Sequence, residues 1–310
     1  MTTILLSRRL RRMATVLALA SLLWPAAARA KTVTDQTGRT LVVPDNPARV
    51  VALAPSITEI VFALGRQDIL KGVTQFSDYP SEALKLPKVG SYVHLDIERI
   101  VALSPDLCIA IKDGNPRQAA ERLTELGIPV YATNPVRLDS IIGTVEEIGG
   151  LLNATDRARR LVDDMKARVA RVDRLVASTP ARPAVFFQIG IAPIVSGGSD
   201  TFIDELITRA GGKNLAAGKT VYPRFSEEDL VELAPDVVVI TSMTRGGEFD
   251  KAMAQWRKWP TLPAVKNNRI YLIDSNLVDR PTPRIVEGLE TLARLIHPEL
   301  FAGERIKDAP

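Results

Sequence analysis

Side chains that usually carry out catalysis or bind metal ions are scarce in this chain of 310 residues. Its histidines are His94 and His297, and its single cysteine is Cys108. The sequence contains no GxSxG, P-loop or GxGxxG pattern. Sites for zinc and similar metals need several His, Cys or carboxylate ligands together. We therefore predict no catalytic site and no site for a bare transition metal, and expect any metal to arrive inside an organic chelate. Ligation by oxygen atoms alone stays open.

Carboxylates support an alternative hypothesis, an exported enzyme that acts on a small molecule. Such an enzyme would use Asp78, Asp113 or Asp200 together with Glu98. Catalysis of this kind needs a nucleophile, a base and a group that orients the base. Because the sequence offers no such set, a binding protein without enzymatic activity is favoured.

Tyrosines are the side chains best suited to hold a ligand. Tyr79 follows the second expected strand, and Tyr92 and Tyr222 each stand six residues before a glutamate, Glu98 or Glu228. In a doubly wound sheet, the loops at the carboxyl ends of the strands form the ligand crevice. A phenol ring offers a flat apolar face and a hydroxyl group, which suits a large, partly polar ring ligand. The tyrosines could instead pack only against their own domains.

Glu98 and Glu228 fit two different roles. Each falls in the first turn of an expected helix, where a carboxylate gains about 0.3–1 kcal/mol from the helix dipole. Alternatively, one glutamate projects from each half of the protein and meets arginines on a two-fold symmetric partner. The residues alone leave both roles open.

The two glutamates begin the two copies of an internal repeat. Glu98–Ile111 and Glu228–Thr241 are 130 residues apart and identical at five of fourteen positions. Asp96 and Ser226 precede the copies as expected helix N-caps. Each copy predicts a short helix, a Pro-Asp turn and an apolar strand. Two copies imply two lobes of similar design, not a solenoid.

The segments around the repeat predict an α/β fold. Residues 31–152 alternate strands and helices, which favours a parallel sheet covered on both faces. Residues 153–179 contain an amphipathic helix, Thr155–Ser178, whose 24 residues would span roughly 36 Å. Residues 180–310 form the second lobe. We expect the long helix to join the two lobes.

Two helix starts are also predicted. Asn153 or Thr155 can cap the long helix, and the final helix should begin at about Pro281, with Pro281 or Pro283 in its first turn, because proline suits that position. His297 stands near the end of that final helix, where a cation complements the helix dipole.

Residues 1–30 have the features of a secretory signal peptide. Four arginines precede the apolar run Met13–Leu23, and Ala28-Arg29-Ala30 is a cleavage signal. The run is shorter than the roughly 20 apolar residues that cross a bilayer. The mature chain should begin near Lys31, which cannot carry a lipid anchor.

Removing the leader changes the charge balance. The full chain carries a formal charge of +4, but the first 30 residues hold five arginines and no acid, so the remainder has a charge of −1. The basic isoelectric point therefore gives no support for nucleic-acid binding. Cys108 lies in an apolar strand without a disulfide partner and should be a small buried hydrophobe. We expect a soluble periplasmic monomer.

Longer segments point to a known family. They run through nearly the whole mature chain: Ala54–Glu59, Phe76–Pro80, Leu95–Ile111, Asp113–Asn115, Leu126–Ile128, Phe187–Gly190 and Asp279–Ile285. In these segments the chain resembles the helical-backbone substrate-binding proteins of ABC importers for cobalamin, haem and ferric siderophores, and most of all the cobalamin-binding members. The resemblance implies two Rossmann-like lobes bridged by one long helix, with the ligand held between them.

The resemblance also implies roles for single residues. Tyr79 matches a tyrosine that contacts cobalamin, and Arg280 matches an arginine near the corrin ring. Tyr92 and Tyr222 stand where the cobalamin binders have tryptophans, and Asn276 stands where they have an aspartate. The expected cleft is therefore less aromatic than in those proteins.

The resemblance finally implies a partner. Glu98 and Glu228 would form salt bridges to arginines of an ABC permease dimer in the inner membrane. The leading hypothesis is a carrier that captures a corrinoid and has no cofactor of its own, with a ferric siderophore or haem as the alternative ligand.

Overall fold

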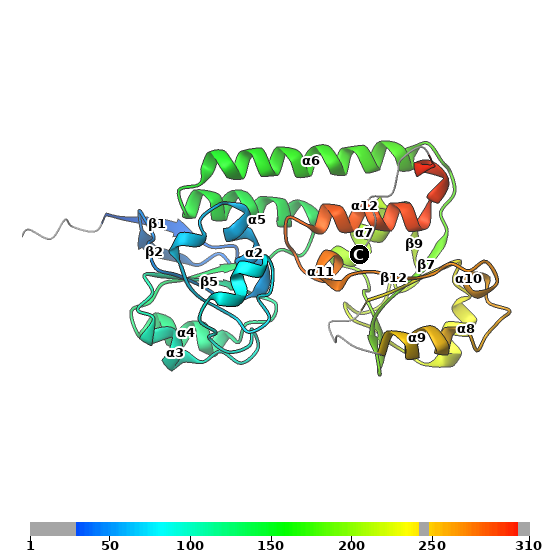
Figure 1. Ribbon diagram of the computed structural model, residues 1–310, viewed down its shortest axis with the longest axis horizontal. Helices are drawn as coiled ribbons and strands as arrows, with labels where there is room; N and C mark the ends of the chain where they lie inside the picture. The colour runs from blue at the N-terminus through cyan, green and yellow to red at the C-terminus, as the bar shows by residue number, and fades with distance from the viewer. Residues whose placement is uncertain (1–28, 242–247, 303–310) are drawn as a thin grey trace, which may run out of the picture.

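The computed structural model describes residues 29–241 and 248–302. Nearly all of the predicted signal peptide, residues 1–28, lies outside this range. Two lobes, each built around its own sheet, lie side by side, and one long helix, α6 (Thr155–Ala177), runs along both (Figure 1). The predicted α/β architecture of two lobes joined by a long helix is confirmed. Within the described ranges, no helix is long and apolar enough to cross a membrane.

The first lobe contains a parallel sheet with the strand order β4-β3-β5-β6. Every residue of β3 and β5 is buried, as expected for strands covered on both faces. An antiparallel hairpin of β1 and β2 precedes the sheet. The elements are β1 (Ala30–Thr34), β2 (Thr40–Pro44), β3 (Val50–Ala52), α2 (Pro55–Ala63), η2 (Gln67–Ile69), β4 (Leu70–Val73), η3 (Ser81–Lys85), α3 (Ile97–Ala102), β5 (Leu107–Ile111), α4 (Arg117–Glu125), β6 (Val130–Thr133) and α5 (Leu138–Leu151).

The second lobe contains a mixed sheet with the order β10-β8-β7-β11-β12, and β9 also pairs with β7. Strand β7 pairs in parallel with β9 and β11, and β11 pairs in parallel with β12. Strand β8 is antiparallel to β7 and β10. The elements are β7 (Ala184–Ile191), β8 (Ile194–Ser196), α7 (Phe202–Arg209), β9 (Lys213–Asn214), β10 (Arg224–Phe225), α8 (Glu227–Leu233), β11 (Val237–Ile240), α9 (Glu248–Trp256), α10 (Pro263–Lys266), β12 (Ile270–Leu272), α11 (Ser275–Val278), α12 (Ile285–Ile296) and η4 (Pro298–Phe301).

The two sheets are thus less alike than the repeat suggests. Only residues 192 and 193 separate β7 from β8, so the chain turns back into an antiparallel pair. A parallel pair would need a crossover of a dozen or more residues. The difference comes from this short connection, which lies outside the repeated segment.

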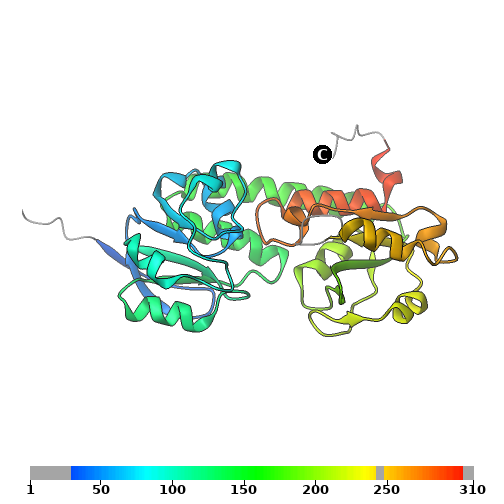
Figure 2. The ribbon, with the colours of Figure 1, turned by 60° about the horizontal axis from the view of Figure 1, so that its bottom comes forward.

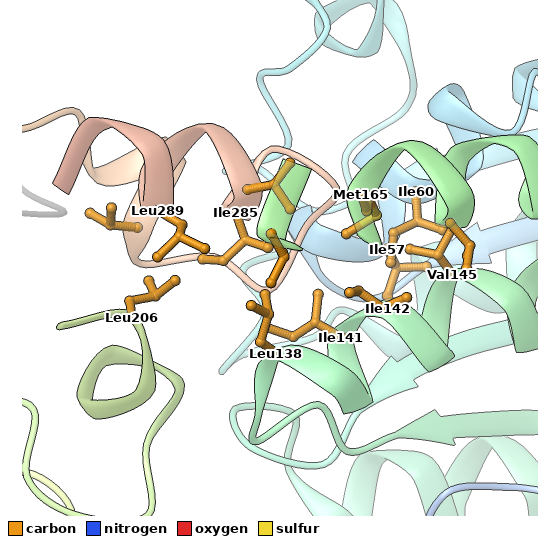
Figure 3. Close-up of a cluster of buried hydrophobic side chains, with 14 of the residues drawn as sticks. Ile57, Ile60, Leu138, Ile141, Ile142, Val145, Met165, Leu206, Ile285 and Leu289 are labelled. Carbon is orange, nitrogen blue, oxygen red and sulfur yellow. The ribbon is translucent and has the colours of Figure 1, made fainter. Parts of the chain in front are cut away.

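Helix α6 packs against α5 of the first lobe and α12 of the second (Figures 1 and 2). The apolar cluster beneath it is continuous between the lobes, and Figure 3 shows Leu138 of α5 near Ile285 of α12. Arg168 of α6 adds an ion pair with Glu290 of α12, with Nη2–Oε2 and Nε–Oε1 distances of 2.7 and 3.1 Å. The buried face of α6 consists of Ala158, Val162, Met165, Val169, Val172 and Val176.

The structure confirms the predicted N-caps of the repeat. The Asp96 side chain accepts a hydrogen bond from the backbone N–H of Arg99, and the Ser226 hydroxyl accepts one from that of Asp229. The aspartates of the two Pro-Asp turns also share a role. Asp106 accepts from the backbone N–H of Arg49, just before β3, and Asp236 accepts from that of Ala184, the first residue of β7. Each aspartate ties its own strand to the neighbouring parallel strand.

Helix α6 begins at Thr155, as predicted, but neither predicted residue caps it, and the predicted start of the final helix is wrong. The N-cap of α6 is Ala154, whose methyl group cannot accept a hydrogen bond. The final helix begins at Ile285 instead of Pro281. A proline disfavours helical geometry in the residue before it, and Pro283 follows Thr282, so the helix starts only after the second proline.

His297 and Cys108 are both buried. His297 is the C-cap of α12, but its ring packs inward, with Nε2 3.1 Å from the carbonyl oxygen of Gly211 and Nδ1 3.0 Å from a carboxylate oxygen of Glu299. Burial raises the pKa of the Cys108 thiol to about 12. The prediction that Cys108 is a buried hydrophobe is confirmed.

Candidate functional site

A cavity of about 380 Å³ lies between the lobes and takes its walls from both. Several lining residues stand at or just beyond the carboxyl ends of strands, such as Ile111 of β5, Asn134 after β6 and Ile189 near the end of β7. This is where parallel sheets place their ligand crevices. Further lining residues are Ser56, Phe76, Tyr92, Val93, Asp113, Val136, Asp200, Phe202, Val221, Tyr222, Asp279 and Arg280.

Tyr92 and Tyr222 face this cavity from opposite lobes. The rings of Tyr92 and Phe76 form a T-shaped pair with a centroid distance of 6.3 Å. Asn115 fixes the backbone behind Tyr92, because its side-chain N–H groups donate to the carbonyl oxygens of Tyr92 (2.7 Å) and Leu53 (2.8 Å). The repeat therefore delivers one tyrosine to each wall of the cleft.

Gly114 leaves the space that the Tyr92 ring occupies. A Cβ atom at this position would lie 2.9 Å from Cδ2 of Tyr92, and the φ angle of Gly114 is +126°. Side chains other than glycine rarely adopt that backbone conformation. Gly114 thus shapes the cavity wall, a role that the sequence alone did not predict.

Arg280 lines the cavity, but its charge is already paired. Its Nη1 lies 3.0 Å from Oδ1 of Asp78 and 3.3 Å from Oε1 of Glu59. Arg284 binds the other oxygen of Glu59 at 2.8 Å, and its guanidinium stacks 3.6 Å from the centre of the Tyr79 ring. These four charged residues, Glu59, Asp78, Arg280 and Arg284, form an inter-lobe ion cluster.

The inter-lobe ion cluster is mostly shielded from water. Only 3% of the Glu59 side chain and 14% of the Arg280 side chain are exposed. Burial is the largest single influence on the pKa of Arg284 and lowers it. Glu59 and other nearby groups together raise the pKa by more, so it lies above its usual range. Because the carboxylates come from the first lobe and the guanidinium groups from the second, the cluster joins the lobes at the cleft.

Two of the predicted ligand-binding residues lie elsewhere. Tyr79 belongs to the stack on Arg284, and Asn276 lies in the short helix α11, where its backbone N–H donates to Asp274. As far as the described residues define the cavity, neither contributes to its lining. Tyr92, Tyr222 and Arg280 are the predicted residues that the fold brings together.

Asp279 is the most perturbed acid in the cavity wall. Its Oδ2 accepts a hydrogen bond from the Thr241 hydroxyl at 2.9 Å, while the buried Oδ1 has no partner among residues 29–241 and 248–302. Burial raises the pKa of Asp279 to about 7, against the opposing effects of Thr241 and Arg280. Asp279 begins one of the segments that resemble the family and precedes Arg280, but the sequence alone gave it no role.

Asp113 and Asp200 stand exposed at the rim of the same cavity. Burial, followed by the charges of Asp113 and Asp279, raises the pKa of Tyr222. Within the described part of the chain, no group of three or more His, Cys, Asp or Glu side chains could hold a metal ion. The geometry is that of a binding cleft with apolar walls and a few polar groups, as small-molecule sites usually are.

Glu98 and Glu228 are exposed in the first turns of α3 and α8. Both helices lie on the side of the molecule opposite α6 (Figure 1). Hydrogen bonds from its own backbone N–H and from Ser226 hold the pKa of Glu228 below its usual range. Both glutamates are thus placed away from the cavity and open to a partner.

Comparison with known proteins decides the family. The model of the periplasmic binding protein family matches residues 50–277. The chain belongs to this family. It is 32% identical over 243 residues to a vitamin B12-binding protein of Vibrio parahaemolyticus, covering 78% of this chain and 86% of the relative.

Solved structures agree on the fold but not on the ligand. The vitamin B12 binding protein BtuF of Vibrio cholerae superposes with a TM-score of 0.74 and 29% identity, covering 82% of this chain and 98% of BtuF. The heme-binding protein RhuT of Roseiflexus superposes with a TM-score of 0.73 and 27% identity, covering 81% and 98%. The chain is therefore a periplasmic substrate-binding protein of the ABC-transporter type. Its relatives are substrate-binding transport proteins, not enzymes, and the family implies a small-molecule ligand and a membrane permease as partner.

Proposed function

We propose that this periplasmic binding protein captures a corrinoid between its lobes. The observation that carries the proposal is a concentration of exposed apolar side chains at the inter-lobe cavity. Phe76, Val93, Val136, Val221 and Tyr222 all line it, and each is between 40% and 48% exposed. Exposed apolar residues that gather in a concave site mark a ligand or partner surface.

The arrangement suits a large ring ligand better than a small polar one. The phenol rings of Tyr92 and Tyr222 offer apolar faces from opposite lobes, and hydroxyl groups that can meet polar substituents. The similarity to vitamin B12-binding relatives supports a corrinoid as the ring.

Calorimetric titration of residues 31–310 with cyanocobalamin tests the proposal. We expect saturable binding at one site. Tyr92→Ala or Tyr222→Ala should weaken it about tenfold, or about 1.4 kcal/mol. The matched variants Tyr92→Phe and Tyr222→Phe keep the rings and should bind within about threefold of wild type. Absence of heat, together with no rise in unfolding temperature at saturating ligand, would contradict the proposal.

Haem is the second candidate, because RhuT is nearly as similar in fold as BtuF. The phenol oxygen of Tyr92 or Tyr222 could ligate haem iron. A shift of the Soret band when hemin is added, lost in the matching Tyr→Phe variant, would favour haem over a corrinoid.

We further propose that Glu98 and Glu228 dock this protein on its permease. Val101 and Val231 stand three residues after the glutamates and are 40% and 42% exposed. Residues three apart share a helix face, so each docking helix presents a carboxylate beside an apolar side chain. The equivalence of the two helices suits a permease with two-fold symmetry.

We also propose export with removal of the leader after Ala30. The motif Ala28-Arg29-Ala30 and the apolar run before it support this step. The intact mass of protein isolated from the periplasm should equal that of residues 31–310, and a retained leader would contradict the proposal.

A further inference from the structure

The charges around the inter-lobe cavity are unbalanced. Of the described residues that line it, three are aspartates, Asp113, Asp200 and Asp279, and one, Arg280, is basic. Asp113 and Asp200 are exposed, and charges shielded from water, such as that of Arg280, act more strongly than charges in bulk solvent. The ligand class that fits this cleft therefore depends on whether the positive charge of Arg280 remains available.

Arg280 has little charge to offer a ligand. Its guanidinium lies between Glu59 and Asp78 and also donates to the carbonyl oxygen of Phe76 at 3.3 Å. Within the inter-lobe ion cluster, two carboxylates face two guanidinium groups, so the cluster has no net charge. Among the described lining residues, Asp113 and Asp200, joined by Asp279 where it is ionised, leave an excess of negative charge.

Asp279 is the aspartate placed to act on a ligand directly. Asp279 lines the cavity; Thr241 occupies its Oδ2, and its buried Oδ1 has no donor in the described part of the chain. A buried oxygen that lacks a donor costs free energy, and a ligand N–H group would remove that cost. A ligand carboxylate at the same place would add repulsion.

We infer that this cleft selects ligands without negative charge, and that Asp279 is a specificity-determining residue whose free oxygen accepts a hydrogen bond from a ligand amide. This inference rests on the proposed ligand-binding function and narrows it. A corrinoid carrying neutral amide side chains fits, whereas a tetrapyrrole with free carboxylates or a polyanionic ferric chelate is rejected. Like-charge repulsion is a common means of excluding a wrong partner.

A matched ligand pair tests the inference. Cyanocobalamin is compared by calorimetry with its monocarboxylic acids, in which one side-chain amide is hydrolysed to a carboxylate and the ring is unchanged. At low ionic strength, where screening is weak, and at about pH 8, above the pKa of about 7 of Asp279, the wild-type protein should bind at least one acid isomer about tenfold more weakly than the amide. Asp279→Asn should reduce that difference to about threefold or less.

Two further variants test whether the charge of Asp279 causes the difference in affinity. Asp274→Asn changes a nearby aspartate outside the cavity lining and keeps an N-cap residue for α11, so it should discriminate like wild type. Glu59→Gln removes one negative partner of Arg280 and Arg284, and should make the cleft more tolerant of the acids. A gain in discrimination from Glu59→Gln would contradict the charge argument.

The outcomes separate the inference from the function it rests on. Equal binding of the amide and all acid isomers overturns the inference and leaves the corrinoid proposal standing. If hemin binds and cyanocobalamin does not, hemin is compared with its dimethyl ester. Tighter binding of the uncharged ester supports charge selection, and tighter binding of hemin overturns it. Failure of all four compounds to bind overturns both.

Discussion

Asp279 illustrates how burial changes the chemistry of a residue. A carboxyl group on the surface ionises near the ordinary value of 3.8, but burial raises the pKa of Asp279 to about 7. The cleft thus contains a carboxyl group that is partly protonated near neutral pH. This property follows from where the fold places the residue and not from its immediate sequence.

The raised pKa of Asp279 makes stability depend on pH. In the unfolded chain this carboxyl group loses its proton near pH 3.8, whereas the folded protein retains the proton up to about pH 7. The contribution of Asp279 to the unfolding free energy is therefore complete below pH 3.8 and declines as pH rises toward 7. Relative to wild type, Asp279→Asn should become more stable across this window, measured by urea unfolding at several pH values. Asp274→Asn should not reproduce that trend, and a constant difference for Asp279→Asn would contradict the assignment.

The inter-lobe ion cluster should matter for stability at the level of a single side chain. Glu59→Ala leaves the buried guanidinium groups of Arg280 and Arg284 with too few partners. Breaking a buried pair in this way should cost about 3 kcal/mol. Glu121→Ala removes an exposed pair with Arg117 and should cost less than about 0.5 kcal/mol. Chemical denaturation measures both, and equal small losses would show that the cluster adds no stability.

At the scale of secondary structure, α6 holds the lobes through its buried face. Met165 is fully buried and lies in the same apolar cluster as Ile57 and Val145 of the first lobe and Ile285 of the second (Figure 3). Packing of this kind, more than helix propensity, stabilises helices in proteins.

Truncating this face should destabilise both lobes together. Met165→Ala removes contacts in a closed core and should cost about 2–5 kcal/mol. Lys166→Ala, one residue further along α6 and exposed, should change the unfolding free energy by less than about 0.5 kcal/mol. Thermal unfolding followed by calorimetry should show one lowered transition for Met165→Ala. Two separate transitions would mean that α6 does not couple the lobes.

At the scale of the whole molecule, the cleft and the proposed docking helices occupy different places. The cavity lies between the lobes, whereas α3 and α8 carry Glu98 and Glu228 on the side opposite α6 (Figure 1). Ligand binding and permease docking should therefore be separable by mutation.

Reversing both docking charges tests this separation. The double variant Glu98→Lys and Glu228→Lys should keep ligand affinity within about twofold and abolish uptake in cells that depend on the carrier. The control Glu125→Lys and Asp250→Lys makes the same charge change at one exposed site in each lobe and should transport normally. Undiminished uptake by the first variant would leave only helix capping as the role of the glutamates.

The sequence by itself determined the features that arise within a few residues. Its repeat predicted the caps at Asp96 and Ser226, and its apolar periodicity predicted α6 to within one residue of the observed end. Such features depend on hydrogen bonds and side-chain spacing inside one turn or one helix. The start of α12 at Ile285 was not predicted, although the effect of Pro283 on the residue before it is local.

Only the tertiary structure decided how distant residues combine in the cleft. Arg280 is more than 200 residues from both Glu59 and Asp78, so nothing in the local pattern shows that its charge is neutralised. The burial of Asp279 likewise depends on how the second lobe packs around it. Ion pairing and desolvation are set by three-dimensional distance, which sequence spacing does not encode across two lobes. The sequence therefore predicted a binding protein with tyrosines in its cleft, whereas the packing of the lobes paired Arg280 with Glu59 and Asp78.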